Sequence, residues 1–107
     1  MNVEFVTKNI NTPFYSIKID WDVDEAKPQA LIDDLIKVGY RDSFPHIPES
    51  FKTNNITLEP EKGSGLFGTH TADEAQVWIS KGCNELYAHG FNTNDIVLRE
   101  LDIRELL

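Results

Sequence analysis

The feature that most constrains the fold is a strict alternation of side chains along residues 15–21, which read YSIKIDW. The apolar positions are Tyr15, Ile17, Ile19 and Trp21, and Ser16, Lys18 and Asp20 separate them. A period of two places the apolar side chains on one side of a β-strand and the polar ones on the other. One buried and one wet face is typical of an antiparallel sheet. We therefore expect a strand over residues 14–21, and apolar elements that cover one of its faces.

Two segments have the spacing of amphipathic helices. In the first, Asp24 and Glu25 suit a helix start, Pro28 is tolerated in a first turn, and Gly39 suits the position after the last turn. Its expected apolar stripe is Leu31, Ile32, Leu35, Ile36 and Val38.

The second helix has the clearer start signal. Thr71 and Glu74 match the capping box, in which each side chain accepts a hydrogen bond from the other residue's backbone N–H. We expect a helix from there to Gly90. Gly82 lies on its apolar side, where it either permits close approach to the sheet or marks a break in the helix.

The remaining strands are shorter. Residues 3–7 form a predicted hairpin with 14–21, residues 55–59 and 66–69 are further candidates, and 96–101 has two half-apolar faces, which predicts an interior strand. Residues 40–55 are expected to be a long loop. The order predicts one α+β domain over residues 1–107, with two helices packed on a mainly antiparallel sheet of four to five strands.

Composition excludes several classes of function. The net charge of −8 repels nucleic-acid phosphate and anionic lipid, so we expect neither nucleic acid nor membrane as a partner. The apolar runs are too short to span a bilayer, the N-terminus lacks a signal peptide, and the single cysteine fits a reducing compartment, which predicts a cytoplasmic protein. The acidity favours a basic protein as partner.

Residues 63–68 read GSGLFG, a literal GxGxxG motif. In dinucleotide-binding folds such glycines bring backbone N–H groups to a pyrophosphate. Here three residues separate the motif from the helix, and Glu100 lies about 32 residues past Gly68 rather than about 20. We therefore expect no dinucleotide and no other cofactor, and retain a small-ligand site at residues 63–73. Its predicted residues are Gly65, His70, Thr71, Asp73 and Trp78.

No metal site is predicted. Asp20, Asp22 and Asp24 alternate like the opening of a calcium loop, but the sixth position is Glu25 instead of glycine and the twelfth is Leu31 instead of an acid. The four cysteine and histidine residues are widely spread.

Three stretches of the chain form a recognisable combination: LIKVGY from Leu35, GSGLFGTHTADEAQVW from Gly63 and IVLRELD from Ile96. The two later stretches resemble the closing part of ADP-ribosyltransferase-like domains, and the first is similar to a step upstream in such domains. The family's opening Arg or His has no counterpart in residues 14–21, and Glu100 is the only candidate for its late acid. The resemblance therefore implies a degenerate, non-catalytic relative.

These observations lead to one main hypothesis and two alternatives. The main hypothesis is a small, acidic, non-enzymatic interaction protein, because no catalytic set occurs at a recognisable spacing. Its predicted contact residues in the 40–55 loop are Tyr40, Phe44, His46 and Phe51. The first alternative is the ligand site at residues 63–73, and the second is a homo-oligomer formed through sheet edges.

Overall fold

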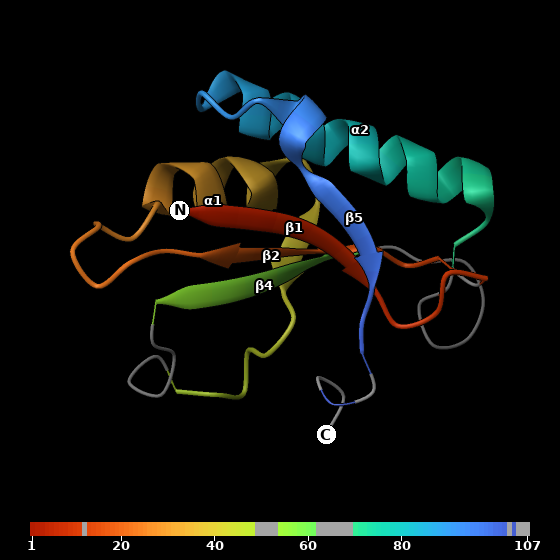
Figure 1. The fold of residues 1–107 in the computed structure, drawn as a ribbon, viewed down its shortest axis with the longest axis horizontal. Helices are drawn as coiled ribbons and strands as arrows, with labels where there is room; N and C mark the ends of the chain where they lie inside the picture. Colours follow the sequence, from red (N-terminus) through yellow and green to blue (C-terminus); the bar gives the residue numbers. More distant parts are fainter. Residues whose placement is uncertain (12, 49–53, 62–69, 103, 105–107) are drawn as a thin grey trace.

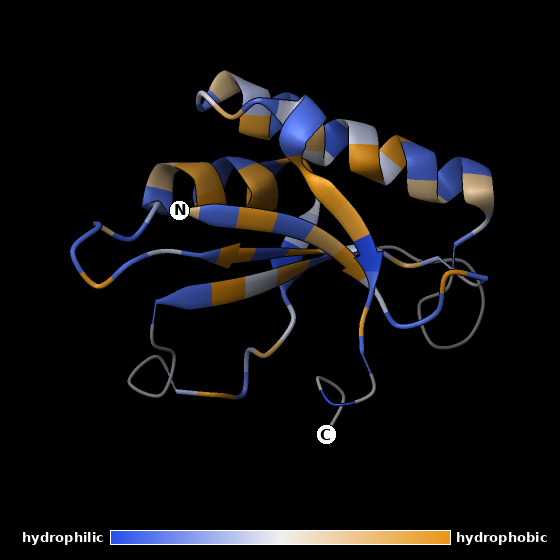
Figure 2. Cartoon of the chain, in the orientation of Figure 1, coloured by the Kyte–Doolittle hydropathy of each residue, from blue (hydrophilic) through white to orange (hydrophobic). Residues whose placement is uncertain are grey.

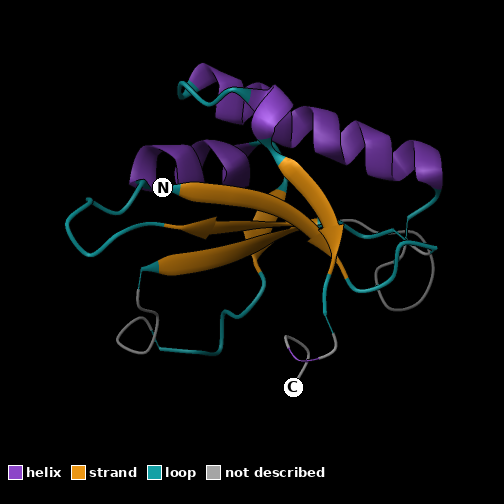
Figure 3. Cartoon of the chain, viewed as in Figure 1, coloured by secondary structure: helices purple, strands orange, loops and turns teal. Residues whose placement is uncertain are grey.

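The computed structural model describes residues 1–11, 13–48, 54–61, 70–102 and 104. The strands are β1 (Asn2–Thr7), β2 (Ser16–Asp20), β3 (Tyr40–Asp42), β4 (Asn55–Pro60) and β5 (Val97–Glu100); the helices are α1 (Gln29–Lys37), α2 (Ala72–Ala88) and the short 3-10 helix η3 (Thr93–Asp95). Helices α1 and α2 lie together on one face of the sheet (Figures 1 and 3). We call the opposite face of the sheet the open face.

The five strands form one sheet in the order β3-β4-β2-β1-β5. Neighbouring strands are antiparallel except for the β1–β5 pair, which is parallel. The predicted hairpin of β1 and β2 is confirmed, with Val3 opposite Ile19 and Phe5 opposite Ile17. The α+β class with a mainly antiparallel sheet is thus confirmed.

The alternation in β2 decides which side of the sheet is covered. Ile17 and Ile19 are fully buried under the helices, whereas Lys18 between them is half-buried on the open face. Strand β4 alternates in the same way, and β1 does so from Asn2 to Phe5, as their colouring by hydropathy shows (Figure 2). The core therefore lies between one face of the sheet and the two helices.

Helix α1 begins later than the sequence predicts. Asp24 and Glu25 do not start it; the backbone N–H of Glu25 donates to Asp22 in a separate turn, at 2.9 Å, and Pro28 is the N-cap. A proline disfavours helical backbone in the residue before it, so the first turn cannot extend upstream. Leu31, Ile32 and Leu35 are buried as expected, but Ile36 is 47% exposed. Gly39 ends the segment with φ of +118°.

Helix α2 follows the prediction closely. Thr71 and Glu74 form the complete capping box, and Gly90 has φ of +92° after the last turn. The helix continues through Gly82, where an added Cβ would lie 3.0 Å from both Ile17 Cδ1 and Phe5 Cζ. Glycine at this position therefore permits the close approach of α2 to the sheet.

Two strand predictions are corrected. Residues 40–42, expected in a loop, form β3, which pairs with β4; a strand of three residues is too short to display a period. Strand β5, expected inside the sheet, lies at its edge, and Val97 and Leu98 are about half exposed. Apolar residues on both faces do not distinguish an interior strand from an edge strand. The short strand predicted over residues 66–69 lies outside the described residues.

None of the helices in the described part of the chain has the length and hydropathy of a membrane-spanning segment.

Candidate functional site

His70, predicted as a polar group of a ligand site, is packed into the domain. It is 5% exposed, with its ring centroid 4.8 Å from that of Phe14 and 6.3 Å from that of Trp78, whose ring is nearly parallel. Its backbone N–H donates to the carbonyl of Pro13 at 3.2 Å. The structure thus brings His70 and Trp78 together, as part of a ring stack that ties the start of α2 to the segment before β2.

Tyr40 joins the same cluster from β3. Its hydroxyl donates to the Trp78 carbonyl at 2.6 Å, and the two rings meet edge to face with centroids 5.3 Å apart. Burial raises the pKa of Tyr40 well above its ordinary value. Lys81 covers the other side of Trp78, with Nζ 4.3 Å from the ring centroid. Tyr40 is fully buried and therefore connects the sheet to α2 from inside the domain.

The other predicted ligand residues do not surround one space in the described structure. The Thr71 hydroxyl accepts a hydrogen bond from the Glu74 N–H at 3.2 Å as the cap of α2. Asp73 is exposed in the first turn of that helix. Gly65 lies outside the described residues, as does the rest of the GxGxxG motif.

The predicted contact loop after β3 is a turn held by three hydrogen bonds. The N–H of Phe44 donates to Asp42 Oδ1 at 2.9 Å, that of Ser43 to the Thr57 carbonyl at 2.9 Å, and that of Ile47 to the Phe44 carbonyl at 3.1 Å. These bonds present Phe44 with 47% of its surface exposed.

The prediction of Tyr40 as a contact residue is wrong, because its side chain is fully buried in the core. His46 is exposed in the same turn as Phe44. Phe51 lies outside the described residues.

A cavity of about 370 Å³ lies on the open face beside Phe44. Val6, Phe14, Phe44 and Leu101 supply apolar lining, and Ser16, Ser43, Thr57 and Glu59 supply polar lining. Val6, Ser16 and Thr57 belong to strands β1, β2 and β4, which are neighbours in the sheet, so the strands form the floor. The segment after β3 and the segment after β5 both lie on this side of the sheet (Figure 1).

A second cavity of about 240 Å³ adjoins the first. Phe44 and Thr57 line both cavities, and Ile47 and Asn55 line only the second. The aromatic ring of Phe44 therefore stands at the boundary of two hollows. Sequence reasoning identified Phe44 but missed the strand residues beneath it, whose only signal was their polar alternation.

The hydroxyl of Ser43 is the unusual polar group of this region. Its Oγ is buried and has no hydrogen-bond partner among the described residues. Buried polar groups are nearly always paired, so an unpaired one calls for a physical reason.

The negative charge of the chain is concentrated on the other side of the sheet. Residues 21–38 and 71–96, which hold both long helices and which we call the helical layer, contain nine acids and three bases, a net charge of −6. The rest of the chain contains nine acids and seven bases, a net charge of −2. The helical layer therefore carries three quarters of the net charge.

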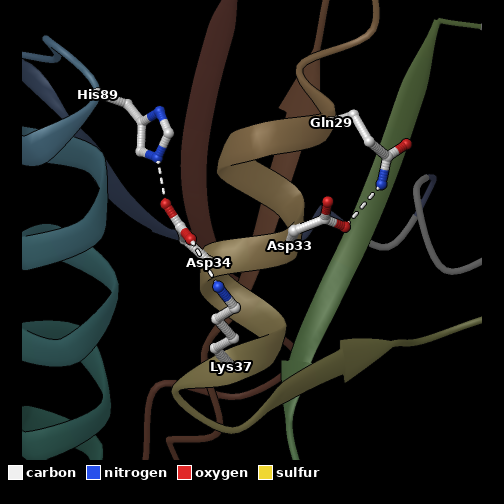
Figure 4. Close-up of polar contacts among 5 residues, drawn as sticks. All are labelled: Gln29, Asp33, Asp34, Lys37 and His89. Atoms are coloured by element: carbon white, nitrogen blue, oxygen red, sulfur yellow. Dashed lines mark hydrogen bonds and ion pairs between the residues drawn. The ribbon is translucent and has the colours of Figure 1, made fainter.

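The two acids of α1 differ in their partners. Asp34 accepts a hydrogen bond from His89 Nε2 at 2.7 Å, which links α1 to the end of α2 (Figure 4). Asp34 also lies 3.9 Å from Lys37 Nζ within α1. Asp33, in contrast, accepts only from the uncharged amide of Gln29, at 2.9 Å, among the contacts drawn in Figure 4. Its charge therefore stays on the surface.

Exposed apolar side chains lie among these acids. On α1, Ile36 is 47% exposed and follows Asp33 by three residues; on α2, Val77 is 54% exposed and follows Asp73 by four. Residues three or four apart are neighbours on a helix surface. Each helix therefore presents an apolar side chain next to a carboxylate.

The N-terminus is held near the start of the helical layer. Glu25 Oε1 accepts hydrogen bonds from the Met1 amine and from the Asp22 N–H, both at 3.0 Å. Both bonds lower the pKa of the Glu25 carboxyl, and the bond from the Asp22 N–H has the larger effect. The bond between Glu25 and Met1 also raises the pKa of the Met1 amine.

The single cysteine of the chain is poorly suited to act as a nucleophile. Burial raises the pKa of the Cys83 thiol, which disfavours the reactive thiolate. No group of three or more His, Cys, Asp or Glu residues in the described ranges is arranged to hold a metal ion.

In comparisons with protein-family models, curated proteins and solved structures, no match to the chain was found.

Proposed function

We propose that this chain is a non-enzymatic interaction protein that binds a basic protein partner through its helical layer. The observation that carries the proposal is the uneven charge, with −6 of the net −8 in residues 21–38 and 71–96. A concentrated field of one sign steers a partner of the opposite sign and raises its association rate.

The exposed apolar side chains support a protein as the partner. Specific protein interfaces combine a desolvated apolar centre with a polar rim. Ile36 and Val77 supply apolar surface on the two helices, and Asp33 and Asp73 supply charge beside them. A purely electrostatic surface would need no such apolar groups.

The test is capture of partners from a matched lysate by the immobilised protein. At about 0.1 M salt, interactions over distances greater than about 10 Å are screened, so only charges near the interface count. We expect the wild type to retain proteins of high pI. A variant with Asp33→Asn and Asp73→Asn should lose most of them, because it removes two charges from the proposed interface.

The matched control changes the same number of charges elsewhere. Asp20→Asn combined with Asp102→Asn acts on the end of β2 and the segment after β5. This variant should retain the partners captured by the wild type. The proposal fails if the wild type enriches no basic protein, or if the two double variants lose the same partners equally.

A further inference from the structure

The cavity on the open face has the size and lining of a small-molecule site. Its volume of about 370 Å³ falls at the lower end of the range of ligand pockets, about 300 to 1,000 Å³. The sheet provides a rigid floor, and the turn that carries Ser43 and Phe44 is fixed by the backbone bond to Thr57 and the side chain of Asp42. A site fixed before binding loses less entropy when a ligand enters.

The walls favour a flat, apolar body. Phe14 and Phe44 contribute aromatic rings, and Val6 and Leu101 contribute aliphatic surface. Phe14 is itself fixed by its contact with His70, at 4.8 Å between centroids. Aromatic rings pack favourably against other planar π-systems.

The polar groups of the cavity favour a ligand edge that forms hydrogen bonds. Three residues of the lining carry a hydroxyl: Ser16, Ser43 and Thr57. The Ser43 Oγ is buried and shielded from the cavity, whereas Ser16 and Thr57 are only half-buried on the strands that form the floor. A ligand edge that carries a donor or an acceptor can therefore form a hydrogen bond with the floor, at Thr57 beside Phe44.

The charges of the lining favour a neutral ligand. Among the described residues of the lining, the charged ones are Lys8 and Glu59, which carry opposite charges. An anion would in addition meet the net charge of −8.

We infer that this cavity binds a neutral, planar heteroaromatic molecule about the size of a purine base. The ring lies against Phe14 and Phe44, and a nitrogen or oxygen on its edge hydrogen-bonds to Thr57. This inference is independent of the proposed function, because the cavity lies on the open face, whereas Asp33 and Asp73 of the proposed interface lie in the helical layer.

The experiment is calorimetric titration of the full chain with adenine, with AMP, and with galactose as a hydroxyl-rich, non-aromatic probe. Saturable binding of adenine is expected. AMP should bind about tenfold more weakly because of its phosphate charge, and galactose should not bind measurably.

Two variants locate the site. Phe44→Ala should weaken adenine binding about tenfold through loss of the ring contact, and Thr57→Val about fivefold through loss of one hydrogen bond. Val77→Ala removes an equally exposed apolar side chain from the helical layer and should leave adenine binding unchanged. Thermal unfolding of each variant verifies that it is folded.

Three results would overturn the inference. The first is the absence of saturable adenine binding to the folded wild type. The second is adenine binding that Phe44→Ala and Thr57→Val leave unchanged, since the ligand would then lie elsewhere. The third is tighter binding of AMP or galactose than of adenine.

Discussion

The two faces of the sheet differ in what covers them and in the surface that results. On the helix-covered face, Ile17 and Ile19 are fully buried and pack against α1 and α2. The helical layer, residues 21–38 and 71–96, carries −6 of the net charge of −8. On the open face, strand residues such as Ser16 and Thr57 are half-buried, and they form the floor of a cavity. One face therefore holds the core, and the other carries a cavity.

The largest difference between the faces should appear in adjacent residues of β2. Ile17→Ala removes a fully buried side chain and should lower the free energy of unfolding by about 2–5 kcal/mol. Lys18→Ala, one residue further on the open face, should change it by no more than about 0.5 kcal/mol. Urea unfolding monitored by Trp fluorescence measures both values. Equal losses would contradict the one-sided core.

The next effect concerns the buried hydroxyl that joins the sheet to α2. Because the pKa of Tyr40 is raised in the folded state, deprotonation favours the unfolded chain, and the stabilisation present below about pH 10 is lost as the pH rises above that value. For one proton the slope is about 1.4 kcal/mol per pH unit. The wild type should show this extra slope relative to Tyr40→Phe.

Denaturant unfolding between pH 8 and pH 11 measures that slope. Tyr87→Phe is the control, because Tyr87 lies on α2, the helix that Tyr40 contacts, and is 73% exposed. The interpretation is contradicted if Tyr40→Phe and the wild type lose stability in parallel, or if Tyr87→Phe removes the slope instead.

A smaller effect is expected at the start of α2. Thr71→Ala removes the side-chain half of the capping box and should cost about 1 kcal/mol. Amide hydrogen exchange should increase most in the first turn, near Asp73 and Glu74, while the β1–β2 pair changes little. Uniform loss of protection throughout the chain would show that the cap supports the sheet as much as the helix.

The smallest effect on stability is expected on the open face. Phe44→Ala removes a side chain that is 47% exposed, so the free energy of unfolding should fall by only about 0.5 kcal/mol. A thermal-unfolding midpoint close to that of the wild type checks this. A large drop would mean that Phe44 belongs to the core and is not available as a binding group.

The fold was largely predictable because its strongest signals are local. The alternation around Ile17 and the capping box at Thr71 each act within one element, and both survive in the structure. The later start of α1 follows from the restriction that Pro28 places on the residue before it. The edge position of β5 depends on how the strands pair, which the residues of a single strand do not reveal. Strand β3 is too short for any period.

The candidate sites were less predictable because they join residues that are distant in the chain. Phe44 was identified from its aromatic character, but its neighbours Ser16 and Thr57 come from other strands. His70 was expected to be accessible, whereas contacts with Phe14 and Trp78 bury it. The concentration of charge on the helical layer became visible only when both helices were placed on one face (Figure 1).

The measurement that tests the separation of the two faces most directly is a map of amide NMR shifts on the wild-type chain. We predict that a lysine-rich peptide shifts amides of α1 and α2, around Asp33 and Asp73, whereas adenine shifts Ser43, Phe44 and Thr57. The two sets should not overlap. Shifts from both probes on the same face of the sheet would contradict the account.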